Sequence, residues 1–243
     1  MAPIRTSFIT PKRRPANDTP KPLQPVKQSE SFDHHEGILR SSFRINDSGS
    51  KVLSVYLDPA ADFEVTVHIG KPGGGGLKLT HRQFQELVCL DSKAAEFFQS
   101  TAEKAEVVTE HGVRVRFSRG WVTPVMKIAV NCADVDQAAS YIVIVEGTFQ
   151  HLTHYTCLYE AACTQLETDR SVVKMIYNDM VGIVRGMGVS QQPSPQVVEQ
   201  RLNATNDTPW LIKDGQYTKM MQTRIYYEIT TMCTEKISNE LRM

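Results

Sequence analysis

The stretch Gly76-Leu-Lys-Leu79-Thr-His-Arg-Gln83-Phe-Gln-Glu-Leu87 contains the end of a strand and the start of a helix. Leu77 and Leu79 flank a lysine, which is the period-two pattern of a half-buried strand. Thr80 and Gln83 match the capping box, in which two side chains satisfy backbone N–H groups at a helix start. Apolar residues then follow at helical spacing: Phe84, Leu87 and Val88. The stretch therefore predicts a strand that leads directly into a helix.

Three further strands are expected before this junction. The segments 43–45, 51–57 and 63–69 are separated by turn-forming sequences, and the last of them alternates apolar and polar residues. A glycine-rich loop over 70–76 connects the third strand to the fourth. Residues 38–100 thus predict four antiparallel strands and a helix that covers one face of the sheet. The other face is expected to present Arg44, Tyr56, Glu64, Thr66, His68 and Lys78.

The same order is expected to recur in the second half of the chain. Alternating or apolar segments predict strands at 113–118, 125–131, 141–145 and 147–152. Leu152-Thr-His154 would then open a helix, as Leu79-Thr-His81 does in the first unit, and the shared tripeptide indicates a duplication. The predicted fold class is α+β, with tandem ββββα units built on antiparallel sheets.

Helices are predicted for the rest of the chain. Tyr155–Gly186 has amphipathic spacing, typical of one long helix or of a pair broken near 168–171. A second apolar stripe includes Met221, Ile225, Ile229 and Met232. This stripe either packs on its own chain or serves oligomerisation and docking of a protein partner. The expected organisation is a tail over 1–37, a first unit over 38–105, a second unit over 106–190, and a linker with a C-terminal helix over 191–243.

The charge of the chain is balanced in total and uneven in its distribution. The 243 residues include 27 basic and 27 acidic groups, so the formal net charge is zero. Residues 1–28, however, contain six basic residues and one acidic residue. Six prolines and few apolar residues predict a disordered tail over 1–37. Its cluster Lys12, Arg13 and Arg14 is interpreted as a nuclear localisation signal or a phosphate-contacting arm, or alternatively as a basic linker.

The lack of a secretory signal and of a membrane-spanning stretch predicts an intracellular protein. The sequence contains no apolar stretch of the length that crosses a membrane, and its N-terminus lacks the apolar core of a secretory signal. Five cysteines, an odd number, are then expected to be reduced thiols. We therefore expect a nuclear or cytoplasmic protein that is neither secreted nor bound to a membrane.

The junction at residues 76–87 resembles the glycine, strand and Gln-aromatic-x-x-Leu helix start of the transcriptional positive cofactor four family. A tandem ββββα pair is similar to the plant Whirly proteins and, more distantly, to the Pur-alpha repeat. The resemblance covers residues 40–100 and, more loosely, 106–167. These families bind single-stranded DNA or RNA on sheet surfaces, and most act as oligomers. The resemblance implies a non-enzymatic nucleic-acid-binding oligomer, such as a transcription or replication accessory factor.

Such binding needs basic side chains for phosphates and aromatic side chains on which bases stack. The candidates in the first unit are Arg44, Tyr56, His68 and Lys78. The candidates in the second unit are Arg114, Arg116, Arg119, Trp121 and Lys127, which form a local arginine-tryptophan patch. The alternative is that all of them are solvated strand positions.

Signs of catalysis or metal binding are weak. The glycines at 73–76 precede a strand and lack the Lys-Ser/Thr of a phosphate loop, so a flexible hairpin tip is the better interpretation. The sequence contains neither G-x-S-x-G nor H-E-x-x-H. We therefore expect no enzymatic activity, no cofactor and no metal. The alternative function is an assembly scaffold, for example in a viral or mobile-element complex, and a third alternative is an enzyme of unrecognised type.

Overall fold

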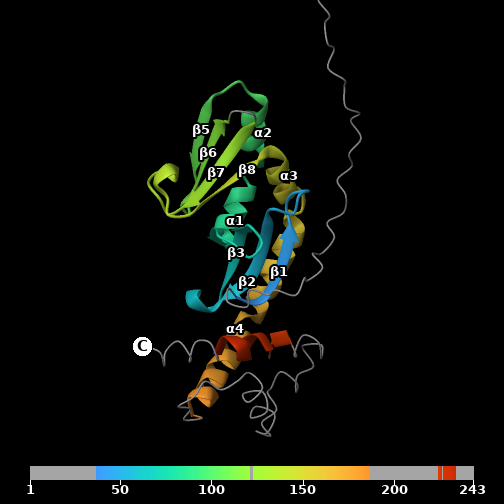
Figure 1. The fold of residues 1–243 in the computed structure, drawn as a ribbon, viewed down its shortest axis with the longest axis vertical. Coiled ribbons are helices and arrows are strands. Elements are labelled where there is room, and N and C mark those ends of the chain that lie inside the picture. The colour runs from blue at the N-terminus through green and yellow to red at the C-terminus, as the bar shows by residue number, and fades with distance from the viewer. Residues whose placement is uncertain (1–36, 121–122, 187–223, 226, 234–243) are drawn as a thin grey trace, which may run out of the picture.

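The structure is a computed structural model that describes residues 37–120, 123–186, 224–225 and 227–233. It contains two four-stranded antiparallel sheets (Figure 1). The first sheet has the order β1 (Ile38–Arg44), β2 (Val52–Asp58), β3 (Glu64–Gly70) and β4 (Gly76–Thr80). The second sheet has the order β5 (Lys104–Val108), β6 (Val113–Arg119), β7 (Pro124–Val130) and β8 (Tyr141–Val145). The helices are α1 (His81–Val88), α2 (Asp91–Gln99), α3 (Glu146–His154) and α4 (Thr156–Gly186), with 3-10 turns η1 (Pro59–Ala61) and η2 (Val135–Gln137).

The predicted α+β class is confirmed, and the first unit follows its predicted order. The Thr80 hydroxyl accepts a hydrogen bond from the Gln83 N–H at 3.2 Å, and the Gln83 side chain accepts one from the Thr80 N–H at 3.0 Å. This reciprocal pair is the predicted capping box, and it starts α1 at the end of β4. The turn before β2 places Gly49 at φ 66°, a left-handed conformation that glycine adopts without steric cost.

The second unit has four strands, but one of the predicted strands was wrong. Residues 147–152 lie in α3, where Thr148, Phe149 and Leu152 are buried at helical spacing. The tripeptide at 152–154 therefore ends a helix instead of opening one, and it no longer supports a duplication. The missing strand is β5, whose residues are mostly exposed and lack an alternating pattern. The predicted boundary between residues 105 and 106 falls inside this strand.

The second helix of each unit packs on the sheet of the other unit. Phe97 of α2 lies 5.2 Å from the ring of Phe117 in the second sheet. In return, α4 runs along the first sheet, where its Tyr177 ring lies 5.0 Å from Phe63 (Figure 1). By contrast, α1 and α3 contact the last two strands of their own units. The two sheets consequently share one apolar core.

The long helix is continuous over Thr156–Gly186, and a short helical segment crosses it. This segment, residues 224–225 and 227–233, buries Ile225, Ile229 and Cys233 completely within the chain. The Glu228 carboxylate accepts a hydrogen bond from the Leu39 N–H and thereby covers the edge of β1. The structure thus favours the alternative in which the apolar stripe packs on its own chain. Met232 packs against the same core, whereas Met221 lies outside the described residues.

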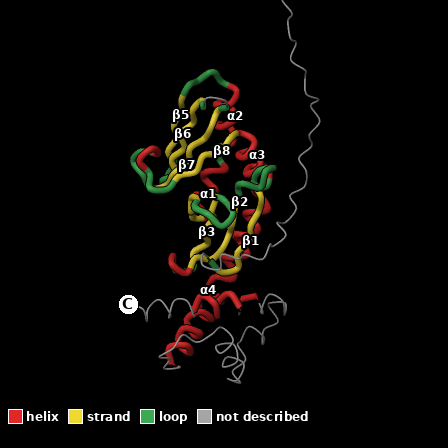
Figure 2. The backbone as a smooth tube through the Cα atoms, in the orientation of Figure 1, coloured by secondary structure: helices red, strands yellow, loops and turns green. Residues whose placement is uncertain are grey.

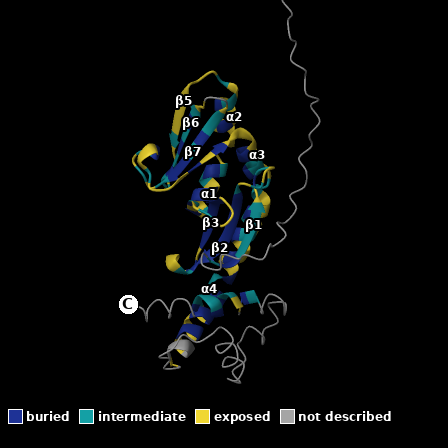
Figure 3. Ribbon diagram, in the orientation of Figure 1, coloured by how far each residue is buried: buried dark blue, intermediate teal, exposed yellow. Residues whose placement is uncertain are grey.

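Helices α1, α3 and α4 contact strands of the sheets, and α4 continues beyond the first sheet (Figure 2). The inner face of the second sheet carries the apolar residues that alternate along its strands: Val113, Val115, Phe117, Met126, Ile128, Ile142 and Ile144. Its outer face carries the alternate positions and is the more exposed of the two (Figure 3). Arg114, Arg116 and Lys127 of the predicted patch lie on that outer face.

Candidate nucleic-acid interface on the second sheet

Strand register brings the outward-facing residues of the second sheet into rows. Arg116 lies between Glu106 on β5 and Lys127 on β7, and Val143 on β8 completes this row. In the neighbouring row, Arg114 lies opposite Val108 and Ala129, and Tyr141 stands at the end. Arg114, Arg116 and Lys127 therefore converge on one face, as alternation along β6 and β7 requires.

Each of these three cations contacts a carboxylate. Glu106 accepts hydrogen bonds from both Arg114 and Arg116. Asp134 accepts one from Arg116 at 2.8 Å. Asp136 contacts Arg116 as well, and its other oxygen accepts a hydrogen bond from Lys127 Nζ at 2.6 Å. Three positive and three negative groups form one network, so this cluster carries no net charge.

The network fixes the ionisation of its members. The hydrogen bond from Arg114 lowers the pKa of Glu106, against the opposing effect of desolvation. The hydrogen bond from Lys127 lowers the pKa of Asp136 in the same way. For Asp134, the backbone N–H of Asp136 is the largest cause of a lowered pKa, and Arg116 adds to it. All three carboxylates are accordingly charged at neutral pH.

Two of the carboxylates come from the connection between β7 and β8, residues 131–140, which we call the acidic loop. The loop turns at Asn131, which has φ 51° and donates its N–H to Gly112 at 3.0 Å. Its 3-10 turn η2 contacts β6 and β7, and Val135 is fully buried there. This anchor holds Asp134 and Asp136 at the cations of the sheet.

An exposed aromatic ring borders the network. Tyr141 on β8 is 48% exposed, and Lys127 Nζ lies 4.0 Å from the centre of its ring. Val143 and Val145 follow on the same face of β8 and are 38% and 43% exposed. The outer face thus combines converging cations with an accessible ring, which is the pair of features that binding of unpaired bases requires.

Arg119 does not join this cluster. Arg119 follows Phe117 at a spacing of two, so it belongs to the opposite side of β6. Its guanidinium donates to the backbone carbonyls of Ala102 and Ser100, before β5. Trp121 lies outside the described residues, as do Lys12, Arg13 and Arg14.

The candidates on the first sheet are differently placed. Tyr56 and His68 are 0% and 2% exposed, so the prediction that they stand on an open face was wrong, and the same holds for the buried Thr66. The Arg40 guanidinium and the Lys78 ammonium lie 5.7 Å and 5.9 Å from the centre of the Tyr56 ring. A fully buried ring offers no face to a base, so Tyr56 is not available for stacking in this conformation.

The other candidates of the first sheet are accessible but do not converge. Lys78 is half exposed and lies 3.4 Å from Asp58, and Arg44 is exposed at the end of β1 beside Gly49. The glycine-rich loop has a packing role at its ends. A Cβ on Gly70 or Gly76 would lie 2.8 Å or 2.6 Å from the His68 ring, so only glycine fits against that ring.

The carboxylates that decide the electrostatics of the interface were not predicted from the sequence. Glu106 was missed because β5 was not predicted. Asp134 and Asp136 were missed because no local pattern indicates that a loop folds back over a sheet. Tyr141 lies at the start of a strand in which exposed and buried residues alternate: Tyr141, Val143 and Val145 are exposed, and Ile142 and Ile144 are buried. This alternation is hard to see in the sequence, because every residue after Tyr141 in the strand is apolar.

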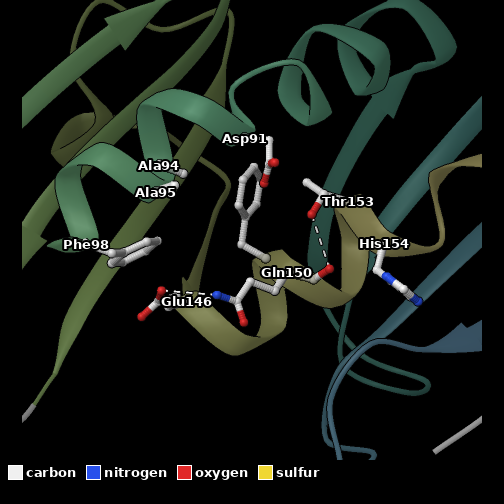
Figure 4. A pocket seen from close by; sticks show the side chains of 9 residues that line it. Asp91, Ala94, Ala95, Phe98, Glu146, Gln150, Thr153 and His154 are labelled. Carbon is white, nitrogen blue, oxygen red and sulfur yellow. Dashed lines mark hydrogen bonds between the residues drawn. The ribbon is translucent and has the colours of Figure 1, made fainter. Parts of the chain in front are cut away.

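Two other parts of the described structure, a cavity and a cluster of two glutamates with a histidine, could in principle hold a ligand or a metal ion. A cavity of about 430 Å³ lies between α2 and α3 and is lined by Phe98, Phe149, Asp91, Glu146 and His154 among others (Figure 4). Glu146 accepts a hydrogen bond from Gln150 along its own helix, so this carboxylate is already engaged within α3. Glu86, Glu110 and His111 also lie close together. There, the Glu86 carboxylate binds the His111 N–H and ring, which holds the β5–β6 turn against α1.

Comparisons of the chain with protein-family models, with curated proteins and with solved structures find no match. Among the described helices, none combines the length and the apolar character that a membrane span needs.

Proposed function

We propose that the protein is a non-enzymatic single-stranded DNA- or RNA-binding protein that uses the outer face of its second sheet. The observation that carries the proposal is the convergence of Arg114, Arg116 and Lys127 beside the exposed ring of Tyr141. Cations that follow a phosphate backbone, next to aromatic rings on which bases stack, are the common arrangement of single-strand binders. The tandem ββββα order, which resembles that of the Whirly proteins, supports the same function.

Each residue has a specific role in this proposal. Arg114, Arg116 and Lys127 contact phosphates, and Tyr141 stacks on a base. Val143 and Val145 extend the apolar surface of β8 beyond the ring. Binding at this surface does not require the other candidate residues, which are Arg44, His68, Lys78, Arg119 and Trp121. The basic cluster at residues 12–14 would supply nuclear import, consistent with a role in transcription or replication.

A salt-titrated binding assay tests the proposal. Fluorescence anisotropy of a labelled oligo-dT or oligo-rU of about 20 nucleotides is measured from about 50 mM to 200 mM salt, because phosphate contacts make affinity fall with salt. Arg114→Ala with Arg116→Ala is expected to weaken binding at least about tenfold and to reduce the salt dependence. Arg170→Ala with Lys174→Ala is the matched control, since it removes two cations of α4 that pair with Asp62 in the connection between β2 and β3.

The stacking role has its own matched pair of variants. Tyr141→Ala is expected to weaken binding roughly tenfold, because base–aromatic stacking contributes about 1–3 kcal/mol per base. Tyr227→Ala removes another exposed tyrosine, 58% exposed and outside both sheets, and should leave binding unchanged. Absence of binding by the wild-type protein at the lowest salt contradicts the proposal.

One observation favours a second function, an assembly scaffold without nucleic-acid affinity. Arg114, Arg116 and Lys127 are neutralised within the chain. In addition, Tyr141, Val143 and Val145 expose apolar surface in a row on β8. Such a row suits contact with another protein or a second copy. Light scattering distinguishes the two functions: a stable oligomer that does not bind oligonucleotides supports the scaffold. A Val143→Asp variant should then dissociate it.

A further inference from the structure

We infer that the acidic loop, residues 131–140, is an intramolecular competitor for the anion site on the second sheet. This inference rests on the proposed function and concerns the regulation of the same surface. In the described structure, Asp134 and Asp136 occupy the positions on Arg116 and Lys127 that phosphates of a bound strand would take. A polyanion reaches these cations only when the loop moves aside.

The geometry of Arg116 shows the substitution most clearly. Its Nη2 donates to Asp134 at 2.8 Å, and its Nη1 donates to Asp136. A guanidinium that holds two carboxylate groups through separate nitrogens resembles a guanidinium that holds a phosphate through two oxygens. Lys127 Nζ donates to the second oxygen of Asp136 at 2.6 Å, as it would to a phosphate oxygen of a bound strand. The loop therefore supplies oxygens of the right charge at the right atoms.

The three carboxylates of the network come from two kinds of element: Glu106 from a strand, and Asp134 and Asp136 from the acidic loop. Glu106 belongs to β5, so it stays beside Arg114 and Arg116 whenever the sheet is formed. Asp134 and Asp136 belong to a connection whose displacement breaks no strand pairing. Removing the loop from the face would leave three cations against one carboxylate, a local excess of two positive charges.

An uncharged side chain also helps to hold the loop on the sheet, together with the hydrogen bonds from the Asn131 N–H to the Gly112 carbonyl and from Arg114 Nε to the Cys132 carbonyl. Val135 stands between the two aspartates and is fully buried. The Asp134 carboxylate also accepts a hydrogen bond from the Asp136 N–H at 2.9 Å, which ties the two aspartates into one unit. Loosening the Val135 anchor should release both carboxylates together. The structure thus offers one electrostatic and one apolar way to open the same surface.

The test compares the affinity of full-length variants for labelled oligo-dT of about 20 nucleotides at about 50 mM and 150 mM salt. Asp134→Asn with Asp136→Asn should bind about tenfold or more tightly than wild type, with a salt slope steeper by roughly one to two phosphate contacts. The control Asp47→Asn with Glu64→Gln removes two exposed acids of the first unit and should change affinity less than about threefold. Thermal unfolding checks that each variant is folded.

Val135→Ala provides the second measurement, because it leaves the charge unchanged. It should also tighten binding, by about threefold or more if the loop opens as a unit. Unchanged or weaker binding by the aspartate variant, while wild type binds, overturns the inference and leaves the proposed function standing. Tighter binding that the control variant matches also overturns it. Failure of wild type and all variants to bind rejects the proposed function itself, and the inference with it.

Discussion

Glu228 and Leu39 are joined by a hydrogen bond across 189 residues of sequence, from the Leu39 N–H to the Glu228 carboxylate at 2.5 Å. Leu39 has φ 58°, an unusual conformation for a leucine, at the irregular start of β1. The same carboxylate pairs with Arg224, whose guanidinium donates to the Arg40 carbonyl. One short helical segment thereby satisfies backbone groups at a sheet edge.

This contact predicts a measurable loss of stability. Glu228→Ala leaves the Leu39 N–H without its acceptor, and a buried donor without a partner costs about 1–3 kcal/mol. Glu228→Gln retains an acceptor oxygen and should lose less. Chemical denaturation of the three proteins checks the order. Equal stability of wild type and Glu228→Ala would show that the edge of β1 does not depend on this residue.

His81 predicts a pH dependence of stability. Its two ring nitrogens lie 2.6 Å from Glu160 and 2.7 Å from Glu167, so both must carry protons if both carboxylates are ionised. Burial opposes the charged form, but hydrogen bonds to Glu167 and Glu160 outweigh it and raise the pKa of His81. The resulting stabilisation is complete below the unfolded-state pKa of about 6.5 and is lost as pH rises through the folded-state pKa.

The melting temperature should therefore fall as pH rises above about 6.5, and His81→Gln should flatten this part of the profile. The difference between the two profiles isolates His81 from other titrating groups. Glu160→Gln with Glu167→Gln is the reciprocal variant and should flatten the same region. Parallel profiles of wild type and His81→Gln would mean that the bridge between α1 and α4 contributes nothing to stability.

Tyr159 predicts a stabilising substitution. Its ring is fully buried between Phe43 and Phe84, and its hydroxyl has no hydrogen-bond partner among the described residues. Burial raises the pKa of this hydroxyl, which is consistent with an apolar environment. Tyr159→Phe keeps the ring and removes the buried polar atom, so it should stabilise the fold by about 1 kcal/mol or more. A loss of stability on denaturation would reveal a partner for the hydroxyl.

The exchange of helices between the units predicts that neither half folds alone. A fragment of residues 37–103 lacks α4, and a fragment of residues 104–243 lacks α2, so each would expose the part of its sheet that the missing helix packs on. Circular dichroism should show no cooperative unfolding of either fragment. Their co-expression should restore a complex that unfolds cooperatively. Independent folding of the first fragment would contradict the shared core.

The features that the sequence predicted correctly are local. The capping box of Thr80 and Gln83 depends on residues three apart, and the alternation along β3 depends on immediate neighbours. The errors concern contacts between distant segments. β5 forms because β6 is beside it, and Tyr56 is buried although its strand position predicts exposure. For the interface, the convergence of Arg114, Arg116 and Lys127 followed from strand alternation, whereas their neutralisation by the acidic loop did not.

The packing of α4 and Glu228 on the first sheet has a consequence for biosynthesis. The ribosome completes β1 to β4 long before it makes the helix that covers them, and Glu228 follows Leu39 by 189 residues. At about 5–20 residues per second, that interval is roughly 10–40 s. During this time the edge of β1 lacks the carboxylate that accepts its Leu39 N–H. A strand edge that stays open during synthesis is the kind of surface through which nascent chains aggregate.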